Sequence, residues 1–224
     1  MSEQPDTKVP PPHATKRKSL IQALAAILTF CGLSALSRLY PIAIFLVVLS
    51  GIVFPLLWTW QTCSWARFGF TRRHLGQALL WGLATGLLLL AIIWLMEGGR
   101  HSAPMLWLQL AVAIPMWILI MSPFQEFFFR GWLQPRFQDA LGRWPGLVVA
   151  SMAFALWHLC PPFEQAQIVP IMTVSSMFFM FGMGLAFGYV FQRTGNIAAP
   201  WLAHVLAGLA LVLTGAMTFI QFND

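Results

Sequence analysis

Long apolar runs separated by short polar segments occupy nearly all of the chain after residue 18. A helix that spans a lipid bilayer needs about 20 predominantly apolar residues. The runs of this kind predict seven spans, near residues 19–37, 41–60, 75–96, 104–122, 145–160, 168–192 and 196–220. A further helix is expected around 123–138, where polar residues interrupt the apolar pattern, so an eighth span stays open. The pattern therefore predicts an all-α, polytopic helical membrane protein with about seven transmembrane helices.

Basic residues in the short loops predict how the chain is oriented, because Lys and Arg collect on the cytoplasmic side of a membrane protein. With the N-terminus in the cytoplasm, the opposite side receives only Arg38 and Arg100. The cytoplasmic side then receives Lys16, Arg17, Lys18, Arg67, Arg72, Arg73, Arg136, Arg143 and Arg193. We therefore predict a multi-pass protein of the cell (inner or plasma) membrane with a cytoplasmic N-terminus and, after seven spans, an outside C-terminus.

Composition agrees with a membrane protein and argues against a nucleic-acid partner. The 224 residues are 58% hydrophobic and 9% charged, whereas a soluble domain carries about a quarter charged residues. The net charge is +6, but the basic residues lie between apolar runs and do not cluster on a soluble face, as nucleic-acid binding would require. The expected partner at this point is the lipid bilayer, with no nucleic acid.

The N-terminal segment differs from the rest of the chain. Residues 1–18 are polar and proline-rich and end in a basic cluster, a composition that predicts a disordered tail. Residues 19–224 are interpreted as a single transmembrane domain. The three cysteines, Cys31, Cys63 and Cys160, have no CxxC spacing and are interpreted as packing residues. Gly184 and Gly188 form a small-xxx-small pattern, for which we expect a role in close helix packing.

Four ionisable residues remain at membrane depth: Glu126, Arg130, His158 and His204. A charged residue near the centre of a spanning helix costs roughly 2.5–3.5 kcal/mol, so such residues usually pair and serve a function. Glu126 and Arg130 are four residues apart on one helix and can neutralise each other, which by itself could be only a fold-specifying ion pair. At about 1.5 Å per residue, Glu126, His158 and His204 lie roughly 18, 20 and 12 Å from the cytoplasmic ends of their expected helices. All three can therefore meet at one level in the bilayer. A buried hydrolytic site and a proton or ion relay both remain open.

Three motifs in this part of the chain resemble those of the CPBP family, which includes CAAX prenyl endopeptidases and bacteriocin-processing enzymes. The segment "QEFFFRGWLQ" resembles the EExxxR(G) motif, and "FALWH" matches FxxxH. The segment "RTGNIAAPWLAHVLAG" resembles the stretch that ends in HxxxN/D. The motifs occur in the family's order, from residue 123 to about 208, which indicates a CPBP-like core at about 104–220.

The resemblance implies an intramembrane endopeptidase in which a glutamate and a histidine activate water and an asparagine or aspartate supports the oxyanion. By that resemblance, His158 and His204 take the water-activating or metal-like positions. Glu126 and Arg130 take the second glutamate and the arginine of the first motif. The substrate would be a membrane-associated protein or peptide, prenylated or not, and self-immunity is a further role known in the family.

Two positions depart from the family pattern. Gln125 stands in place of the first glutamate, and its amide cannot accept and return a proton. Gly208 stands in place of the asparagine or aspartate, and Asn196 is about 12 Å along the helix from His204, too far to be an obvious replacement. An active protease with Glu126 or a histidine as base therefore stands beside an inactive member that acts in binding or bacteriocin self-immunity.

The sequence also leaves metal use open. Glu126, His158 and His204 could hold zinc as three protein ligands plus water. Pairing with Arg130 would make the Glu126 carboxylate a poorer ligand, so a tightly bound zinc ion is not favoured. No other cofactor is indicated.

Overall fold

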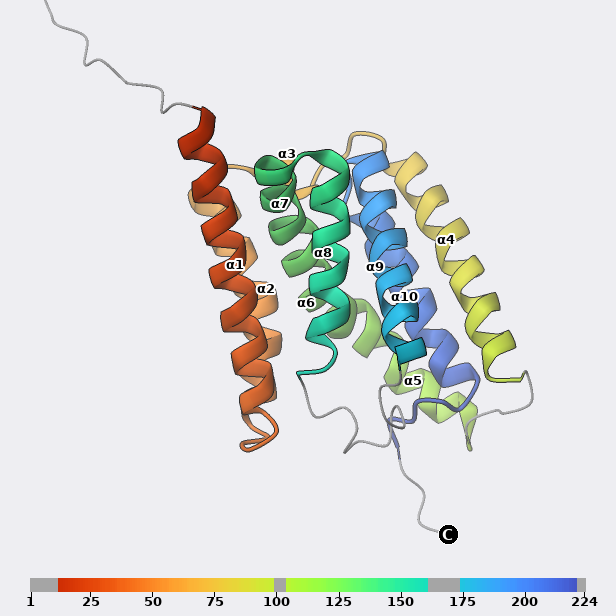
Figure 1. The fold of residues 1–224 in the computed structure, drawn as a ribbon. Helices are drawn as coiled ribbons and strands as arrows, with labels where there is room; N and C mark the ends of the chain where they lie inside the picture. The colour runs from red at the N-terminus through yellow and green to blue at the C-terminus, as the bar shows by residue number, and fades with distance from the viewer. Residues whose placement is uncertain (1–11, 99–103, 161–173, 221–224) are drawn as a thin grey trace, which may run out of the picture.

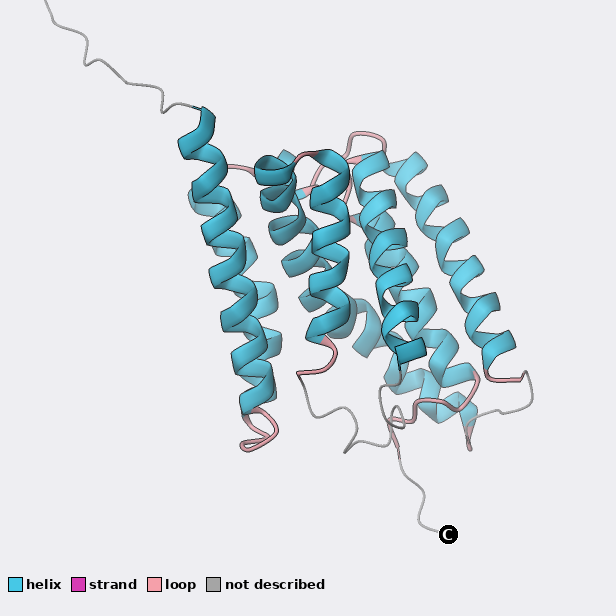
Figure 2. Cartoon of the chain, viewed as in Figure 1, coloured by secondary structure: helices cyan, strands magenta, loops and turns pink. Residues whose placement is uncertain are grey.

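A computed structural model describes residues 12–98, 104–160 and 174–220, and these residues form helices and turns without a strand (Figures 1 and 2). Two short stretches inside the longest helix, Trp117–Met121 and Phe127–Leu133, are π-helical. The α-helices are α1 (Pro12–Leu36), α2 (Ala43–Gln61), α3 (Trp65–Phe68), α4 (Leu75–Met96), α5 (Leu106–Met116), α6 (Ser122–Glu126), α7 (Gln134–Leu141), α8 (Arg143–Trp157), α9 (Val174–Thr194) and α10 (Ala198–Leu213). The all-helical prediction is confirmed over these ranges.

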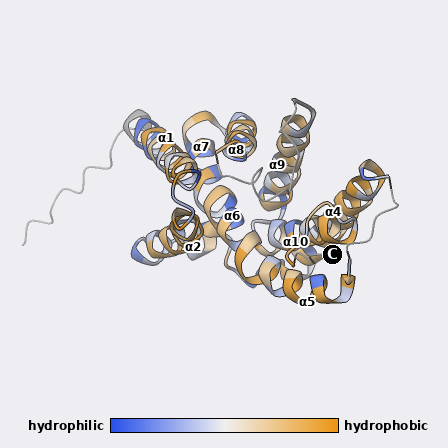
Figure 3. Cartoon of the chain, turned by 90° about the horizontal axis from the view of Figure 1, so that it is seen from below, coloured by the Kyte–Doolittle hydropathy of each residue, from blue (hydrophilic) through white to orange (hydrophobic). Residues whose placement is uncertain are grey.

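Among the described residues, four helical stretches are long and apolar enough to cross a membrane. They are Thr15–Leu36, Ala43–Gln61, Leu75–Met96 and Leu106–Leu141, and the apolar helix α10 is shorter. Hydrophobic residues are spread along all of the long helices (Figure 3). Many large apolar side chains are exposed, among them Leu28 at 71% and Leu95 at 76%. Such a surface suits lipid and not water, so the chain is a helical membrane protein.

The helix expected around 123–138 is not separate from the span before it, because residues 106–141 form one continuous helical stretch of 36 residues. We call this stretch the motif rod. At about 1.5 Å per residue, 36 residues would extend roughly 54 Å, well beyond a hydrocarbon core of about 30 Å. The rod therefore has to bend, and Figure 1 shows α5 lying across the lower end of the bundle before α6 and α7 rise through it. Pro115 and the two π-helical stretches lie where such bends are expected.

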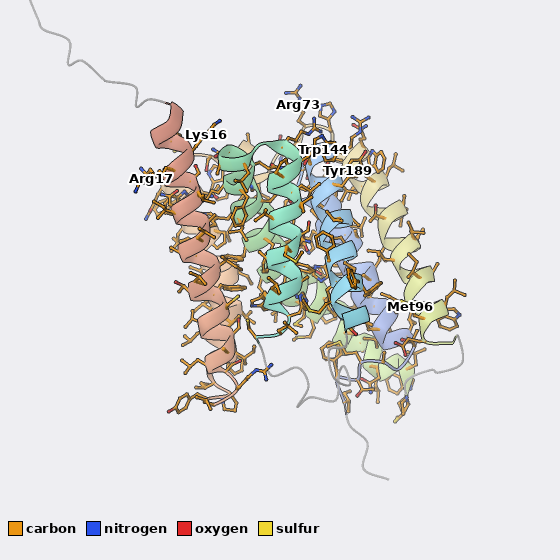
Figure 4. The ribbon with its side chains drawn as sticks, in the orientation of Figure 1. Lys16, Arg17, Arg73, Met96, Trp144 and Tyr189 are labelled. Carbon is orange, nitrogen blue, oxygen red and sulfur yellow. The ribbon has the colours of Figure 1, made fainter. Side chains whose placement is uncertain are left out.

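Other helix ends differ from the expected spans by a few residues. Helix α1 begins at Pro12, seven residues before the expected start, and α8 ends at Trp157. Residues 161–173, which include the expected start of the sixth span, lie outside the described residues, as do residues 1–11. Lys16, Arg17 and Arg73 lie toward one end of the bundle and Met96 toward the other (Figure 4), as the basic loops predicted. That the basic end faces the cytoplasm stays a prediction.

The core lies where α1, α8 and the motif rod meet. Phe30 of α1 stacks on Phe128 with ring centroids 4.1 Å apart and on Trp157 at 5.5 Å. The Trp157 indole also donates a hydrogen bond of 2.7 Å to the Ser34 hydroxyl. These aromatic contacts hold one face of the motif rod rigidly, which fixes the direction of its polar face.

The glycines of α9 have the packing role predicted for them. A Cβ atom on Gly184 would lie 3.0 Å from the Cα atom of Ser151, and one on Gly188 would lie 2.4 Å from the Leu147 side chain. Helix α8 therefore packs against α9 so closely that a side chain at either position would require its neighbours to shift.

Candidate active site

One face of the motif rod carries a row of polar or indole side chains: Trp117, Ser122, Glu126, Arg130 and Gln134. All five residues are buried. The π-helical stretch Trp117–Met121 has five residues per hydrogen-bonded turn, which brings Trp117 into line with Ser122. The remaining members follow at intervals of four, the spacing that puts side chains on one face of an α-helix. The local helix geometry therefore aligns groups that the sequence scatters among apolar residues.

Glu126 is the centre of this row and is completely buried. Its Oε1 atom lies 2.6 Å from His204 Nδ1 and accepts a hydrogen bond of 3.3 Å from Arg130 Nη1. When Glu126 is ionised and His204 is neutral, the carboxylate can only accept, so Nδ1 of His204 carries the hydrogen and Nε2 carries the lone pair. Glu126 thus fixes both the tautomer and the orientation of an imidazole whose second nitrogen can take a proton.

Arg130 links this centre to α9. Its Nη2 atom donates to the Gly184 carbonyl at 3.3 Å, and its guanidinium carbon lies 4.2 Å from the centre of the Phe154 ring. Gln134 makes the parallel contact one turn further on, from Nε2 to the Gly188 carbonyl at 3.0 Å. The Glu126–Arg130 pair therefore joins the motif rod to α9 and also contacts His204. Its position is compatible with a fold-specifying ion pair and with a part in the candidate site.

His204 of α10 is held by aromatic rings as well as by Glu126. Its ring stacks on Phe187 with centroids 4.8 Å apart, and Trp117 lies 5.7 Å away. The His204 side chain is only 5% exposed. This packing leaves the imidazole little freedom to rotate away from the carboxylate.

His158 adjoins this group but does not contact Glu126 directly. It caps the C-terminal end of α8, is partly exposed, and places Nδ1 2.8 Å from the Phe154 carbonyl. Phe154 lies between the two histidines, with its ring 4.6 Å from His158 and 6.2 Å from His204. His158 is also close enough to His204 and Arg130 to interact with both electrostatically. The structure therefore brings Glu126, Arg130 and His204 into contact and leaves His158 one ring away.

Gln125 points away from this group. Its Nε2 atom donates to the Met121 carbonyl at 3.3 Å, one turn back along its own helix. Its Oε1 atom is buried and has no hydrogen-bond partner among the described residues. Gln125 therefore makes none of the contacts that join Glu126, Arg130 and His204.

Trp117 is the site residue that sequence reasoning missed. A Cβ atom on Gly208 would lie 2.2–2.5 Å from atoms of the Trp117 indole, so this ring occupies the space that a side chain at position 208 would need. The Trp117 Nε1 atom is buried and unpaired within the described chain, as are Ser122 Oγ and Glu126 Oε2. One tryptophan among 11 gives no sequence signal of its own; only the fold shows that it fills the gap left by Gly208.

Asn196 does not replace the missing asparagine or aspartate. Its side-chain oxygen accepts a hydrogen bond from the Ala198 amide at 3.0 Å, and its Nδ2 atom donates to the Thr71 carbonyl at 2.8 Å. The residue therefore fixes the start of α10 to the loop before α4, as expected for an asparagine next to a helix N-terminus.

Residues 106–210 match the protein-family model described as Rce1-like, type II CAAX prenyl endopeptidase. Over this region the chain is similar to the Rce1-like family. The match covers the motif rod, α8, α9 and most of α10, and so includes all residues of the site. It confirms the family that the three motifs resemble. Searches of curated proteins and of solved structures found no match.

The site does not assemble the zinc ligands considered from the sequence. Over residues 12–98, 104–160 and 174–220, no three His, Cys, Asp or Glu side chains are grouped so that they could hold a metal ion. Glu126 Oε1 is already engaged by Arg130 and His204, and His158 is separated from His204 by Phe154. The side chains present therefore do not fit a zinc ion.

An apolar cleft on the other side of the motif rod is separate from this site. It has a volume of about 430 Å³ and opens between α1 and α2. Its lining includes Phe30, Phe54, Trp58, Phe128 and Trp132, and none of the ionisable site residues. Because Glu126 and Phe128 point to different sides of the rod, the cleft and the site are divided by the rod itself.

Proposed function

We propose that the chain is an intramembrane endopeptidase that hydrolyses a peptide bond of a membrane-associated substrate, with His204 as the general base. The observation that carries this proposal is the 2.6 Å contact between Glu126 Oε1 and His204 Nδ1 in a buried site. A carboxylate bonded to Nδ1 holds the imidazole for proton transfer at Nε2 and stabilises the imidazolium that forms. This assignment needs no carboxylate at position 125.

The reaction would proceed in two steps. His204 Nε2 removes a proton from water while the water oxygen bonds to the carbonyl carbon of the scissile peptide, whose oxygen becomes an oxyanion. The imidazolium then gives that proton to the departing amine nitrogen as the carbon–nitrogen bond breaks, which returns His204 to its starting form. Glu126 stays ionised throughout, and its pairing with Arg130 keeps it a stabiliser and not a base. His158, beside the site, is assigned to orienting the water.

Trp117 is assigned to the oxyanion. Its Nε1 is a hydrogen-bond donor without a partner among the described residues, and its ring lies 5.7 Å from the His204 ring. Leaving such a buried donor unpaired costs about 1–3 kcal/mol in the resting protein. A donor of this kind that becomes paired only when charge develops on the substrate oxygen lowers the barrier to reaction. Trp117 would then supply what Gly208 lacks.

The family match favours, as substrate, a peptide that is prenylated near its C-terminus. A suitable assay uses the purified chain in lipid nanodiscs with a farnesylated CAAX peptide, the same peptide without the lipid, and a set of unrelated membrane peptides. Mass spectrometry of the products identifies the cleaved bond. Wild-type cleavage should fall by about 10²–10⁴ in His204→Ala, the range that general base catalysis contributes. Absence of any cleavage by the wild type would instead favour the inactive binding or self-immunity protein.

A further inference from the structure

A polar pocket lies at the basic end of the bundle, outside the site described above. It has a volume of about 290 Å³ and is formed by the end of α2, by α3 and by the motif rod between Gly131 and Arg136. The lining residues are Trp58, Thr59, Thr62, Ser64, Arg67, Phe68, Gly131, Trp132 and Arg136. The pocket contains none of the residues assigned to peptide hydrolysis.

Arg136 is fixed in this pocket by tryptophan rings and has a free donor. Its guanidinium carbon lies 3.7 Å from the centre of the Trp132 ring and 4.9 Å from that of Trp58. Its Nη1 atom donates to the Trp132 carbonyl at 2.7 Å. Its Nε atom is buried and has no hydrogen-bond partner within the described residues. A rigid guanidinium with an unpaired donor is suited to binding an oxyanion.

The charge of the pocket matches an anion with one negative charge. Arg67 also lines the pocket and forms an ion pair with Asp139, which neutralises it. The charge left over is that of Arg136, or +1. The Thr62 hydroxyl donates to the Trp58 carbonyl at 2.7 Å and lies 2.8 Å from the Ser64 hydroxyl, so Ser64 donates to Thr62. The pocket thus offers one net positive charge, and its ligand-binding donors come from arginine.

We propose that this pocket binds the phosphodiester of an anionic phospholipid headgroup. The location favours a lipid, because the exposed Trp60 and Trp65 flank the pocket in sequence and tryptophan concentrates at the membrane–water interface. Basic pockets between membrane helices on the cytoplasmic side are suited to lipid headgroups. A phosphodiester carries the single negative charge that the pocket would neutralise. The site goes beyond the proposed peptidase function and does not depend on it.

The test measures the unfolding temperature of the full chain in detergent micelles with added phosphatidylglycerol, phosphatidylcholine or inorganic phosphate. We expect phosphatidylglycerol to raise the unfolding temperature of the wild type, because a ligand that binds the folded state stabilises it. Phosphatidylcholine and inorganic phosphate should have little effect. Arg136→Met should weaken the apparent affinity by about tenfold or more, the loss expected for one charged hydrogen bond.

Charge variants separate this pocket from general surface attraction and do not depend on Arg136→Met folding well. Arg67→Gln leaves Asp139 unneutralised and should lower the response to phosphatidylglycerol, whereas Arg67→Gln/Asp139→Asn restores the +1 charge and should restore the response. Arg72→Gln, an exposed change outside the pocket, should leave it intact. An equal loss in Arg72→Gln, or an equal response to phosphatidylcholine, overturns the proposal. So does a response confined to inorganic phosphate.

Discussion

At the scale of single residues, the candidate site contains two contacts that differ in how well the sequence predicts them. One joins a carboxylate to a histidine, and the other places an indole N–H donor nearby. The Glu126–His204 contact links residues 78 positions apart, and the sequence allowed it to be expected, because both residues are expensive at membrane depth and lie at similar levels. The Trp117–Gly208 contact could not be expected. Tryptophan is common in this chain, and nothing in the local pattern indicates which indole lies against a glycine on another helix.

Changing Glu126 to Gln tests the role of the carboxylate. The amide oxygen can still accept from His204 Nδ1, but it no longer stabilises the imidazolium, so kcat should fall by about 10²–10⁴. The same change leaves the Arg130 charge buried and unpaired, a loss of about 3–5 kcal/mol in stability. Glu126→Gln/Arg130→Met removes both charges and should recover much of the unfolding temperature without recovering cleavage. Recovery of cleavage in the double variant would contradict the role assigned to Glu126.

Changing Trp117 to Phe tests the oxyanion assignment. Phenylalanine keeps most of the ring and lacks the N–H group, so kcat should fall by about 10²–10³ while KM changes little. Trp81→Phe, the same substitution on α4, is the matched control and should leave kcat unchanged. A phosphinate peptide, which mimics the tetrahedral intermediate, gives a readout that does not require turnover. Equal phosphinate affinity in wild type and Trp117→Phe would rule out the assignment.

A motif-restoring variant gives a second test at the same place. Gly208→Asn alone should destabilise the protein, since its Cβ would lie 2.2 Å from the Trp117 ring. Trp117→Ala/Gly208→Asn makes room for the amide and should cleave faster than Trp117→Ala alone. The comparison uses kcat at equal amounts of folded protein. If the double variant is no faster than Trp117→Ala, then a donor at this point does not limit the reaction.

At the scale of elements, the motif rod is where sequence and structure differ most. The polar residues Gln125, Glu126 and Arg130 lowered the hydropathy of residues 123–138 and suggested a break after residue 122. In the structure they form no break, because Glu126 and Arg130 find partners on α10 and α9 and their charges are satisfied inside the bundle. Hydropathy records the cost of burying a group alone and contains nothing about a partner on a distant helix.

Helix α9 offers a test of the close packing that supports Arg130 and Gln134. Gly188→Ala would place a Cβ atom 2.4 Å from Leu147 and 2.8 Å from Gln134 Oε1. We expect a stability loss of about 1–3 kcal/mol, typical of overpacking. Gly182→Ala on the same helix meets nothing within 4 Å and should be neutral. The measurement is the unfolding temperature of Gly188→Ala, of Gly182→Ala and of Gly188→Ala/Leu147→Ala. The Gly182→Ala variant reports the effect of helix propensity alone, and the double variant tests whether the loss at position 188 comes from the contact with Leu147. Equal losses at positions 182 and 188 would contradict the packing role.

At the scale of the whole molecule, the orientation of the chain in the membrane decides from which side a substrate reaches the site. The basic residues Lys16, Arg17 and Arg73 lie toward one end (Figure 4), and Cys63 is exposed between α2 and α3. Arg38 lies beyond the other end of α1 and donates to the carbonyls of Leu159 and Cys160. A cytoplasmic basic end places Cys63 in the cytoplasm and residue 38 outside.

Cysteine labelling tests this orientation directly. In a variant with Cys31→Ala and Cys160→Ala, Cys63 should react with a membrane-impermeant maleimide in inverted vesicles and not in intact cells. Cys63→Ala with Arg38→Cys, made in the same background, should show the opposite pattern, and permeabilised cells control for reactivity. Labelling of Cys63 in intact cells would contradict the predicted orientation and place the basic end outside. The pocket at Arg136 would then face the outer leaflet, and a substrate made in the cytoplasm would have to reach the site from the far end of the bundle. The two vesicle preparations thus test the side of entry independently of whether the protein cleaves.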